Sequence, residues 1–310
     1  MTHKIRANGL SMTFVVAIAV VKVIFMPCAP GGRCMIRGAK RCPDRDCESA
    51  ASAFLGVLVL WLWSPWLLAG LNTVEEDALT SGLAAIVHQG IVIELGSAGS
   101  RFKAVLYRNR QPHERGLMIY LPEAGQRLDA GVIQGLRRVL PDHGWSVLSL
   151  QLPVLEVDAR EEEYLSLVPQ ASGRIDAAVA RMKTAGMKNI ALLGHGYGFL
   201  VALDYLRKHG ETAIRALALL SPWWPESWHQ ELQGWLAQVK VPVLDVYAER
   251  DRARVLMTAG ERHRLLKGRE GYRQWRISGT GHHYRGLEES LAKRIFGWLQ
   301  SVAPGREEVL

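Results

Sequence analysis

The sequence predicts an α/β protein with a mostly parallel central sheet that an antiparallel hairpin opens and that helices cover on both faces. From residue 90 onward, short apolar runs alternate with amphipathic stretches of helical spacing. Helices of this length between strands favour parallel pairing through right-handed crossovers, and continuously apolar strands indicate a sheet buried on both sides. The chain has 310 residues and is 48% hydrophobic, so it can bury a large core.

The first elements of this sheet are a hairpin and two buried strands. Residues 91–95 and 102–107 flank the turn GSAGSR, which is typical of a β-hairpin. After it we expect a strand in RGLMIYLPEAG, a helix over 131–140 that ends at PDHG, and a strand in WSVLSLQLP. The acidic segment 154–172 is predicted to be either an excursion near the pocket mouth or a solvated loop. A helix in SGRIDAAVARMKTAG is then expected to begin near Ser172 or Gly173.

The second half of the pattern continues the alternation to the C-terminal helix. The strand KNIALLG precedes the helix FLVALDYLRKHG, which a glycine closes just past its end. The remaining strands are predicted in IRALALLSP, VPVLDVYAERD and YRQWRISG, with helices between them and a last helix in LEESLAKRIFGWLQSV.

Charge and cysteine content exclude several classes of function for the main domain. The formal net charge is +8, but residues 1–71 hold eight Lys/Arg against three Asp/Glu, which leaves only +3 for the rest. We therefore expect no nucleic-acid partner. All four cysteines (Cys28, Cys34, Cys42 and Cys47) precede the domain, so it has no thiol nucleophile and no disulfide. Their spacing completes no zinc pattern, and we expect no metal and no cofactor.

Two apolar stretches precede the domain, over 10–26 and 50–74. The second carries no formal charge and is long enough to cross a bilayer or to form the core of a signal peptide. A basic segment containing Met35 lies between them, so the translation start is either Met1 or Met35. We interpret 1–34 as an upstream extension with an apolar segment, 35–73 as a signal peptide or signal anchor, and 74–310 as the folded domain.

The basic segment also predicts on which side of the membrane the domain lies. Positively charged flanks stay in the cytosol, so either one or two crossings place the domain outside. The protein is therefore expected to be exported, either periplasmic or membrane-anchored, with an N-terminal segment that inserts in or passes through the membrane. Cleavage stays open, because residues 67–70 form only a weak small-residue site, while Trp61, Trp63 and Trp66 suit an interfacial anchor.

Three stretches in a fixed order resemble the α/β-hydrolase family over about residues 88–302. KNIALLGHGYG resembles the strand and nucleophile elbow, with elbow residues Gly194, His195, Gly196, Tyr197 and Gly198. VPVLDVYAERD resembles the strand that ends in the triad acid, and SGTGHHYRG the loop that carries the triad histidine. The resemblance implies Asp251 and His282 as triad residues and places Glu123 and Ala124 in the oxyanion loop. Uncharacterised exported bacterial proteins with such domains, having glycine in place of the elbow serine, are similar to this chain.

Gly196 stands at the nucleophile position of that elbow and has no side chain to supply a nucleophile. Glycine adopts the strained elbow backbone easily, yet it leaves the position chemically empty. Three replacements are considered: His195 beside it, Ser221 at the end of a neighbouring strand, and Glu123 as an activator of water. Asp251 and His282 form either a proton relay or a structural hydrogen-bonded pair, and Asp251 alternatively caps a helix beginning at Arg252.

Trp223, Trp224 and Trp228 follow the sixth strand above the expected crevice. They form either an aromatic lip of a ligand pocket or the packing of a short helix onto the sheet.

Two functional hypotheses follow for the domain. The first is a non-catalytic pseudoenzyme at the cell envelope that binds an unknown small ligand or an envelope protein. The second is an atypical hydrolase or esterase in which His282 and Asp251 serve a non-standard nucleophile or an activated water.

Overall fold

The computed structural model describes residues 73–87, 89–97 and 99–305. The strands are β1 (Ile91–Ser97), β2 (Ser100–Tyr107), β3 (Gly116–Leu121), β4 (Trp145–Leu150), β5 (Ile190–His195), β6 (Ile214–Leu220), β7 (Val243–Arg250) and β8 (Arg273–Gly281). The α-helices are α3 (Thr73–Thr80), α4 (Leu83–Ile86), α5 (Ile133–Val139), α6 (Val168–Thr184), α7 (Tyr197–His209), α8 (His229–Gln238), α9 (Ala253–Leu266) and α10 (Glu288–Val302). The 3-10 helices are η1 (Leu140–His143), η2 (Glu161–Leu167) and η3 (Glu226–Trp228).

The eight strands form one sheet in the order β1-β2-β4-β3-β5-β6-β7-β8. β1 and β2 form the antiparallel hairpin, and β2 is also antiparallel to β4. Every other neighbouring pair, from β4 across to β8, is parallel. The predicted fold class, a mostly parallel sheet opened by an antiparallel hairpin, is confirmed.

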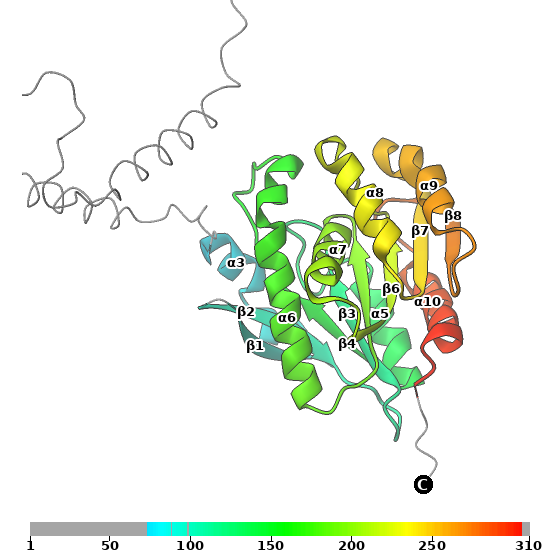
Figure 1. Cartoon of the computed structure of the whole chain (residues 1–310). Coiled ribbons are helices and arrows are strands. Elements are labelled where there is room, and N and C mark those ends of the chain that lie inside the picture. The colour runs from blue at the N-terminus through cyan, green and yellow to red at the C-terminus, as the bar shows by residue number, and fades with distance from the viewer. Residues whose placement is uncertain (1–72, 88, 98, 306–310) are drawn as a thin grey trace, which may run out of the picture. The chain divides into compact units, whose positions relative to one another are not determined.

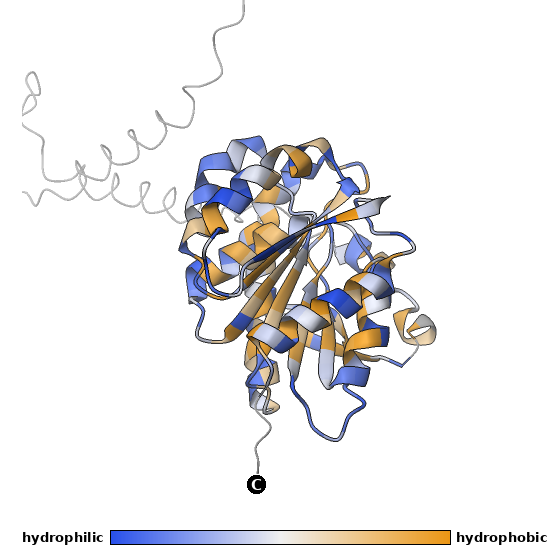
Figure 2. Ribbon diagram, turned by 90° about the vertical axis from the view of Figure 1, so that its right-hand side faces the viewer, coloured by the Kyte–Doolittle hydropathy of each residue, from blue (hydrophilic) through white to orange (hydrophobic). Residues whose placement is uncertain are grey.

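Both faces of the sheet are buried under helices, as the apolar strands predict (Figure 1). β3 illustrates the alternation of side chains: Leu117, Ile119 and Leu121 belong to the core shared with α6, α7 and α8, whereas Met118 and Tyr120 belong to the core shared with α5 and α10. Figure 2 shows hydrophobic strands surrounded by helices that carry both hydrophilic and hydrophobic segments. The two cores fix the strand ends on which the site is built.

The segment 154–172 is more ordered than the predicted loop. It contains η2, and α6 begins at Val168, several residues before the expected start near Ser172. Pro169 lies in the first turn of α6, where its missing N–H has no cost. Ser172 is not the cap of this helix, because its hydroxyl donates to Asp204 Oδ2 at 2.6 Å instead.

The predictions for the N-terminal region fall outside the described residues. These are the upstream extension 1–34, the signal peptide or anchor over 35–73 except for its last residue, and the choice between Met1 and Met35. Within the part of the chain that the structure describes, no helix is long and apolar enough to span a bilayer.

Candidate functional site

Five strands end at one edge of the sheet, and a residue of the candidate site stands just after each of them. Glu123 follows β3, Gly196 follows β5, Ser221 follows β6, Asp251 follows β7 and His282 follows β8. Because β3 and β5 to β8 are mutually parallel, their carboxyl ends meet at this edge. Open α/β sheets bind ligands at such an edge, so the topology brings these residues together.

Gly196 makes the sharp turn between β5 and α7. Its backbone has φ 51° and ψ −108°, a conformation that strains residues with a side chain, and its N–H donates to the Leu220 carbonyl at 2.9 Å. Gly198 lets α7 approach β3, because a Cβ at this position would lie 2.2 Å from the Leu121 carbonyl oxygen. The elbow sequence therefore folds as a strand-turn-helix even though it lacks a serine.

The carboxylate of Glu123 fills the space that a side chain at position 196 would need. A Cβ built on Gly196 would lie 1.1 Å from Glu123 Oε1, a distance that no pair of unbonded atoms tolerates. Glu123 is buried in this position. The sequence placed Glu123 in a loop near the site, but it did not reveal that its side chain occupies the nucleophile position.

His282 lies between two carboxylates. Its Nδ1 is 2.6 Å from Asp251 Oδ1, and its Nε2 is 3.1 Å from Glu123 Oε1, where the two groups form an ion pair without hydrogen-bond geometry. Burial lowers the pKa of His282, but the Asp251 hydrogen bond and the Glu123 carboxylate outweigh it and raise this pKa to about 9. Burial raises the pKa of Glu123, yet contact with His282 and the charge of Arg252 lower it to about 2. At neutral pH the pair is therefore an imidazolium and a carboxylate.

Arg252 holds the second oxygen of Glu123. Its Nη2 is 3.1 Å from Glu123 Oε2, and its Nη1 is 2.5 Å from Glu161 Oε1 in η2. The acidic segment thereby contributes one carboxylate to the network around the site. No sequence motif points to Arg252, and its place directly after Asp251 is the one available signal.

Asp251 accepts hydrogen bonds from four donors, one of which is the Ser221 hydroxyl. Its Oδ2 accepts the Ala248 N–H at 2.8 Å and the Ser221 hydroxyl at 2.5 Å, and its Oδ1 accepts the Arg252 N–H at 2.9 Å besides His282. Because α9 begins at Ala253, Asp251 does not act as its N-cap residue. Ser221 is fully buried with φ 44°, and its hydroxyl serves the acid rather than the histidine.

The remaining elbow and oxyanion-loop side chains, those of His195, Tyr197 and Ala124, are buried or partly buried. His195 is fully buried, and burial lowers its pKa to about 4, so its imidazole is neutral. Its Nε2 lies 3.1 Å from the backbone carbonyl of His282. Tyr197 is buried in the α6–α7 core, and Ala124 packs partly buried against the same core.

The three tryptophans pack into the core, and the expectation of an aromatic lip is corrected for Trp223 and Trp224. Both are buried, and Trp224 stacks on Phe199 with ring centroids 5.8 Å apart. Trp228 is partly buried and meets Trp235 edge-on at 5.6 Å. Large apolar rings beside η3 and α8 gain more from burial in this core than from lining an open mouth.

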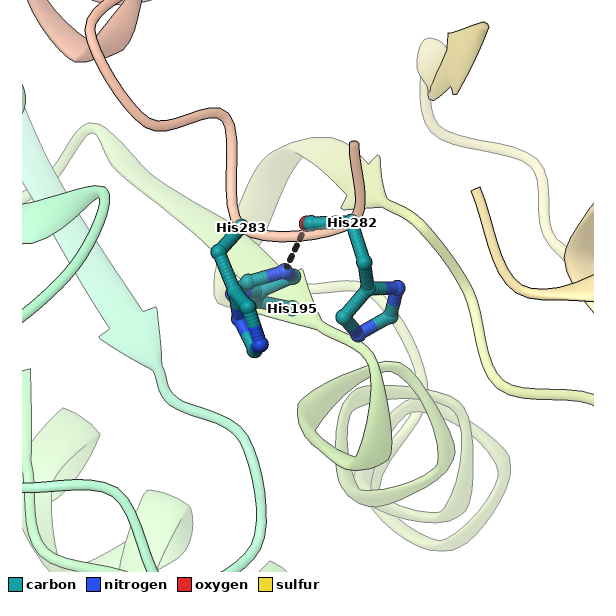
Figure 3. A group of neighbouring side chains, drawn as sticks. All are labelled: His195, His282 and His283. Carbon is teal, nitrogen blue, oxygen red and sulfur yellow. Dashed lines mark hydrogen bonds between the residues drawn. The ribbon is translucent and has the colours of Figure 1, made fainter. Parts of the chain in front are cut away.

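His283 also lies at the site, although the resemblance to α/β-hydrolases implies only its neighbour His282. His195, His282 and His283 lie close together, as Figure 3 shows. A cavity of about 350 Å³ opens beside them, lined by His282 and His283 together with Arg250 and Arg285 and the segment 279–281. Two histidines in a row after β8 were the available signal.

The sheet order, the elbow and the Asp251–His282 pair define an α/β-hydrolase-fold protein. Solved structures of this class match the chain, and each comparison establishes the fold alone. Est1E from Butyrivibrio proteoclasticus matches with a TM-score of 0.56 at 15% identity, over 68% of this chain and 98% of its own. Dienelactone hydrolase from Anabaena variabilis matches with a TM-score of 0.56 at 17% identity, over 70% of this chain and 100% of its own. An α/β serine hydrolase without lid from Xanthomonas campestris matches with a TM-score of 0.56 at 12% identity, over 71% of this chain and 98% of its own.

The chain belongs to the family described as "Protein of unknown function (DUF3530)". The profile of that family matches residues 75–164 and 156–301, which together include every strand of the sheet. No curated protein matches the chain.

Proposed function

We propose that this protein is an exported α/β-hydrolase-like protein that has exchanged serine hydrolysis for binding at the cell envelope. One observation carries the proposal: the carboxylate of Glu123 stands where the side chain of a nucleophilic serine would begin. A serine hydrolase needs a hydroxyl there and a neutral histidine beside it to take the hydroxyl proton. Here the hydroxyl is absent, and the histidine is paired with an anion.

The charge state of His282 supports the same conclusion. With a pKa raised to about 9 by Asp251 and Glu123 against the effect of burial, His282 already holds its second proton at neutral pH. A protonated imidazole cannot act as a general base. In this proposal Asp251 and His282 are retained as a structural unit, in which His282 is ion-paired with Asp251 and with Glu123 at the elbow.

A second candidate is an atypical hydrolase in which His282 activates water. The specific observation in its favour is the preserved Asp251–His282 contact at 2.6 Å beside an open cavity. Because the pKa of His282 is about 9, such activity would grow as the pH rises toward 9 and the imidazole becomes neutral. A binding protein shows no such profile.

Ester hydrolysis by the full chain separates the two candidates. We expect the unaltered protein to hydrolyse p-nitrophenyl acetate no faster than its His282→Ala variant at every pH from 6 to 9. The double variant Glu123→Ala/Gly196→Ser removes the carboxylate and supplies a hydroxyl, so we expect it to gain turnover that the added change His282→Ala abolishes. Hydrolysis by the unaltered protein that disappears in His282→Ala would establish the atypical hydrolase instead.

A further inference from the structure

Three histidines from two segments gather where β5 and β8 end. His195 is the last residue of β5, and His282 and His283 directly follow β8. One ring nitrogen from each can be chosen so that all three lie within 4.8 Å of one another (Figure 3). Imidazole is the commonest protein ligand for Zn²⁺ and similar cations, so this cluster merits a test of its donor atoms.

The tautomer of His195 leaves a buried lone pair. Its Nε2 lies 3.1 Å from the backbone carbonyl oxygen of His282, and a carbonyl can only accept, so Nε2 carries the hydrogen. Nδ1 is then an acceptor. Among the described residues it finds no hydrogen-bond partner, although the side chain is fully buried. A buried polar atom without a partner is costly and calls for an explanation.

His282 is held in the way that metal-binding histidines are held. Asp251 fixes its Nδ1 at 2.6 Å, the carboxylate contact that orients the ring and makes the other nitrogen a better donor. That other nitrogen, Nε2, is likewise buried and has no hydrogen-bond partner within the described part of the chain. Glu123 Oε1, another buried atom with no hydrogen bond there, lies 3.1 Å from it.

His283 supplies the accessible side of the cluster. Its side chain is exposed, and it lines the 350 Å³ cavity together with His282, which gives an ion a path from solvent. A tetrahedral Zn²⁺ with Zn–N bonds of about 2.1 Å holds its ligand nitrogens about 3.4 Å apart. The chosen nitrogens lie within 4.8 Å of one another, so the rings must move closer to hold an ion, and the exposed ring of His283 is the least confined by packing.

We propose that His195, His282 and His283 bind a divalent transition-metal ion of the Zn²⁺ type at the edge of the sheet. The ion takes the place of the proton between His282 Nε2 and Glu123 Oε1, and the carboxylates of Glu123 and Asp251 compensate its charge. This inference goes beyond the loss of the serine and does not depend on it, because metal binding is measured without any hydrolysis.

The test is stoichiometric metal binding by the full chain, purified in mild detergent without a histidine tag and stripped with EDTA. Calorimetric titration with Zn²⁺ measures affinity, and Co²⁺ reports a tetrahedral site through its strong visible absorption. We expect one site per chain and a loss of at least about tenfold in affinity for His283→Ala, which removes an exposed ligand and leaves the core untouched. His113→Ala removes another exposed histidine, far along the chain, and should bind as the unaltered protein does.

His282→Ala, checked for an unchanged circular-dichroism spectrum, should abolish the Co²⁺ absorption. An absence of stoichiometric binding would overturn the proposal, as would Zn²⁺ affinity that both His283→Ala and folded His282→Ala leave unchanged. Both of these results concern metal binding alone, whereas the proposed function is tested by ester hydrolysis. The failure of this site and the failure of the proposed function are therefore distinguishable.

Discussion

At the scale of single residues, the site depends on two positions, Gly196 and Glu123. Gly196 removes the nucleophile and opens a space, and Glu123 places a carboxylate in that space. The carboxylate pairs with buried His282 on one side and with the partly exposed guanidinium of Arg252 on the other. Neither residue alone would produce this arrangement, because a side chain at 196 would collide with Glu123.

The ion pair makes stability depend on pH in the metal-free protein. The pKa of His282 rises from 6.5 to about 9 on folding, so its stabilisation is complete below pH 6.5 and is lost as the pH rises through 9. Glu123→Gln removes one of the carboxylates that raise this pKa. We expect the decline in the free energy of unfolding between pH 6.5 and 9 to become shallower in the variant.

Urea unfolding in EDTA at stepped pH measures this effect, with Glu94→Gln as the control for loss of a surface carboxylate. Glu94 pairs with Arg101, and both side chains are exposed. Identical pH slopes for the unaltered protein and Glu123→Gln would show that Glu123 does not hold the proton on His282.

At the scale of elements, a buried ion pair holds the first described helix to the domain. Glu76 in α3 receives two contacts from Arg174 in α6, at 2.8 and 2.9 Å, and both side chains are buried. The guanidinium also lies over the Phe102 ring, 4.9 Å from its centroid. The contact joins the hairpin, α6 and the segment that leads in from the N-terminus.

Glu76→Ala should therefore cost far more than a surface substitution. It strands a buried guanidinium, which costs about 3–5 kcal/mol of unfolding free energy, whereas Glu94→Ala removes an exposed pair worth under about 1 kcal/mol. Urea unfolding of the two variants provides the comparison. Equal and small losses would mean that Arg174 is not dependent on its partner.

The elements were predictable from sequence to the extent that local pattern determines them. The strands and the hairpin follow from apolar runs and the Gly/Ser turn, and the order of elbow, acid and histidine locates Gly196, Asp251 and His282. The start of α6 was missed because Pro169 and the acidic run suggest a loop until the core beneath them is known. The position of the Glu123 side chain depends on a contact between β3 and β5 loops, which no local pattern encodes.

At the scale of the whole molecule, we propose that the N-terminal segment connects the domain to a membrane. We propose that the basic residues around Met35 stay in the cytosol and that the domain is exported. N-terminal sequencing of the protein recovered from outside the cytoplasm tests this proposal. An N-terminus near residue 70 indicates a cleaved signal peptide and an intact start indicates a retained anchor, whereas recovery of the chain only from the cytosol would contradict export.

We propose that the α/β-hydrolase fold of this protein carries the Glu123 carboxylate in place of a nucleophilic serine. The most direct test is covalent labelling by a fluorophosphonate, which reacts with an activated serine hydroxyl. The label is detected through the mass of the intact full chain. We expect no adduct on the unaltered protein and one adduct on Glu123→Ala/Gly196→Ser. A stoichiometric adduct on the unaltered protein would contradict the account, because it would reveal an activated nucleophile that Glu123 has not replaced.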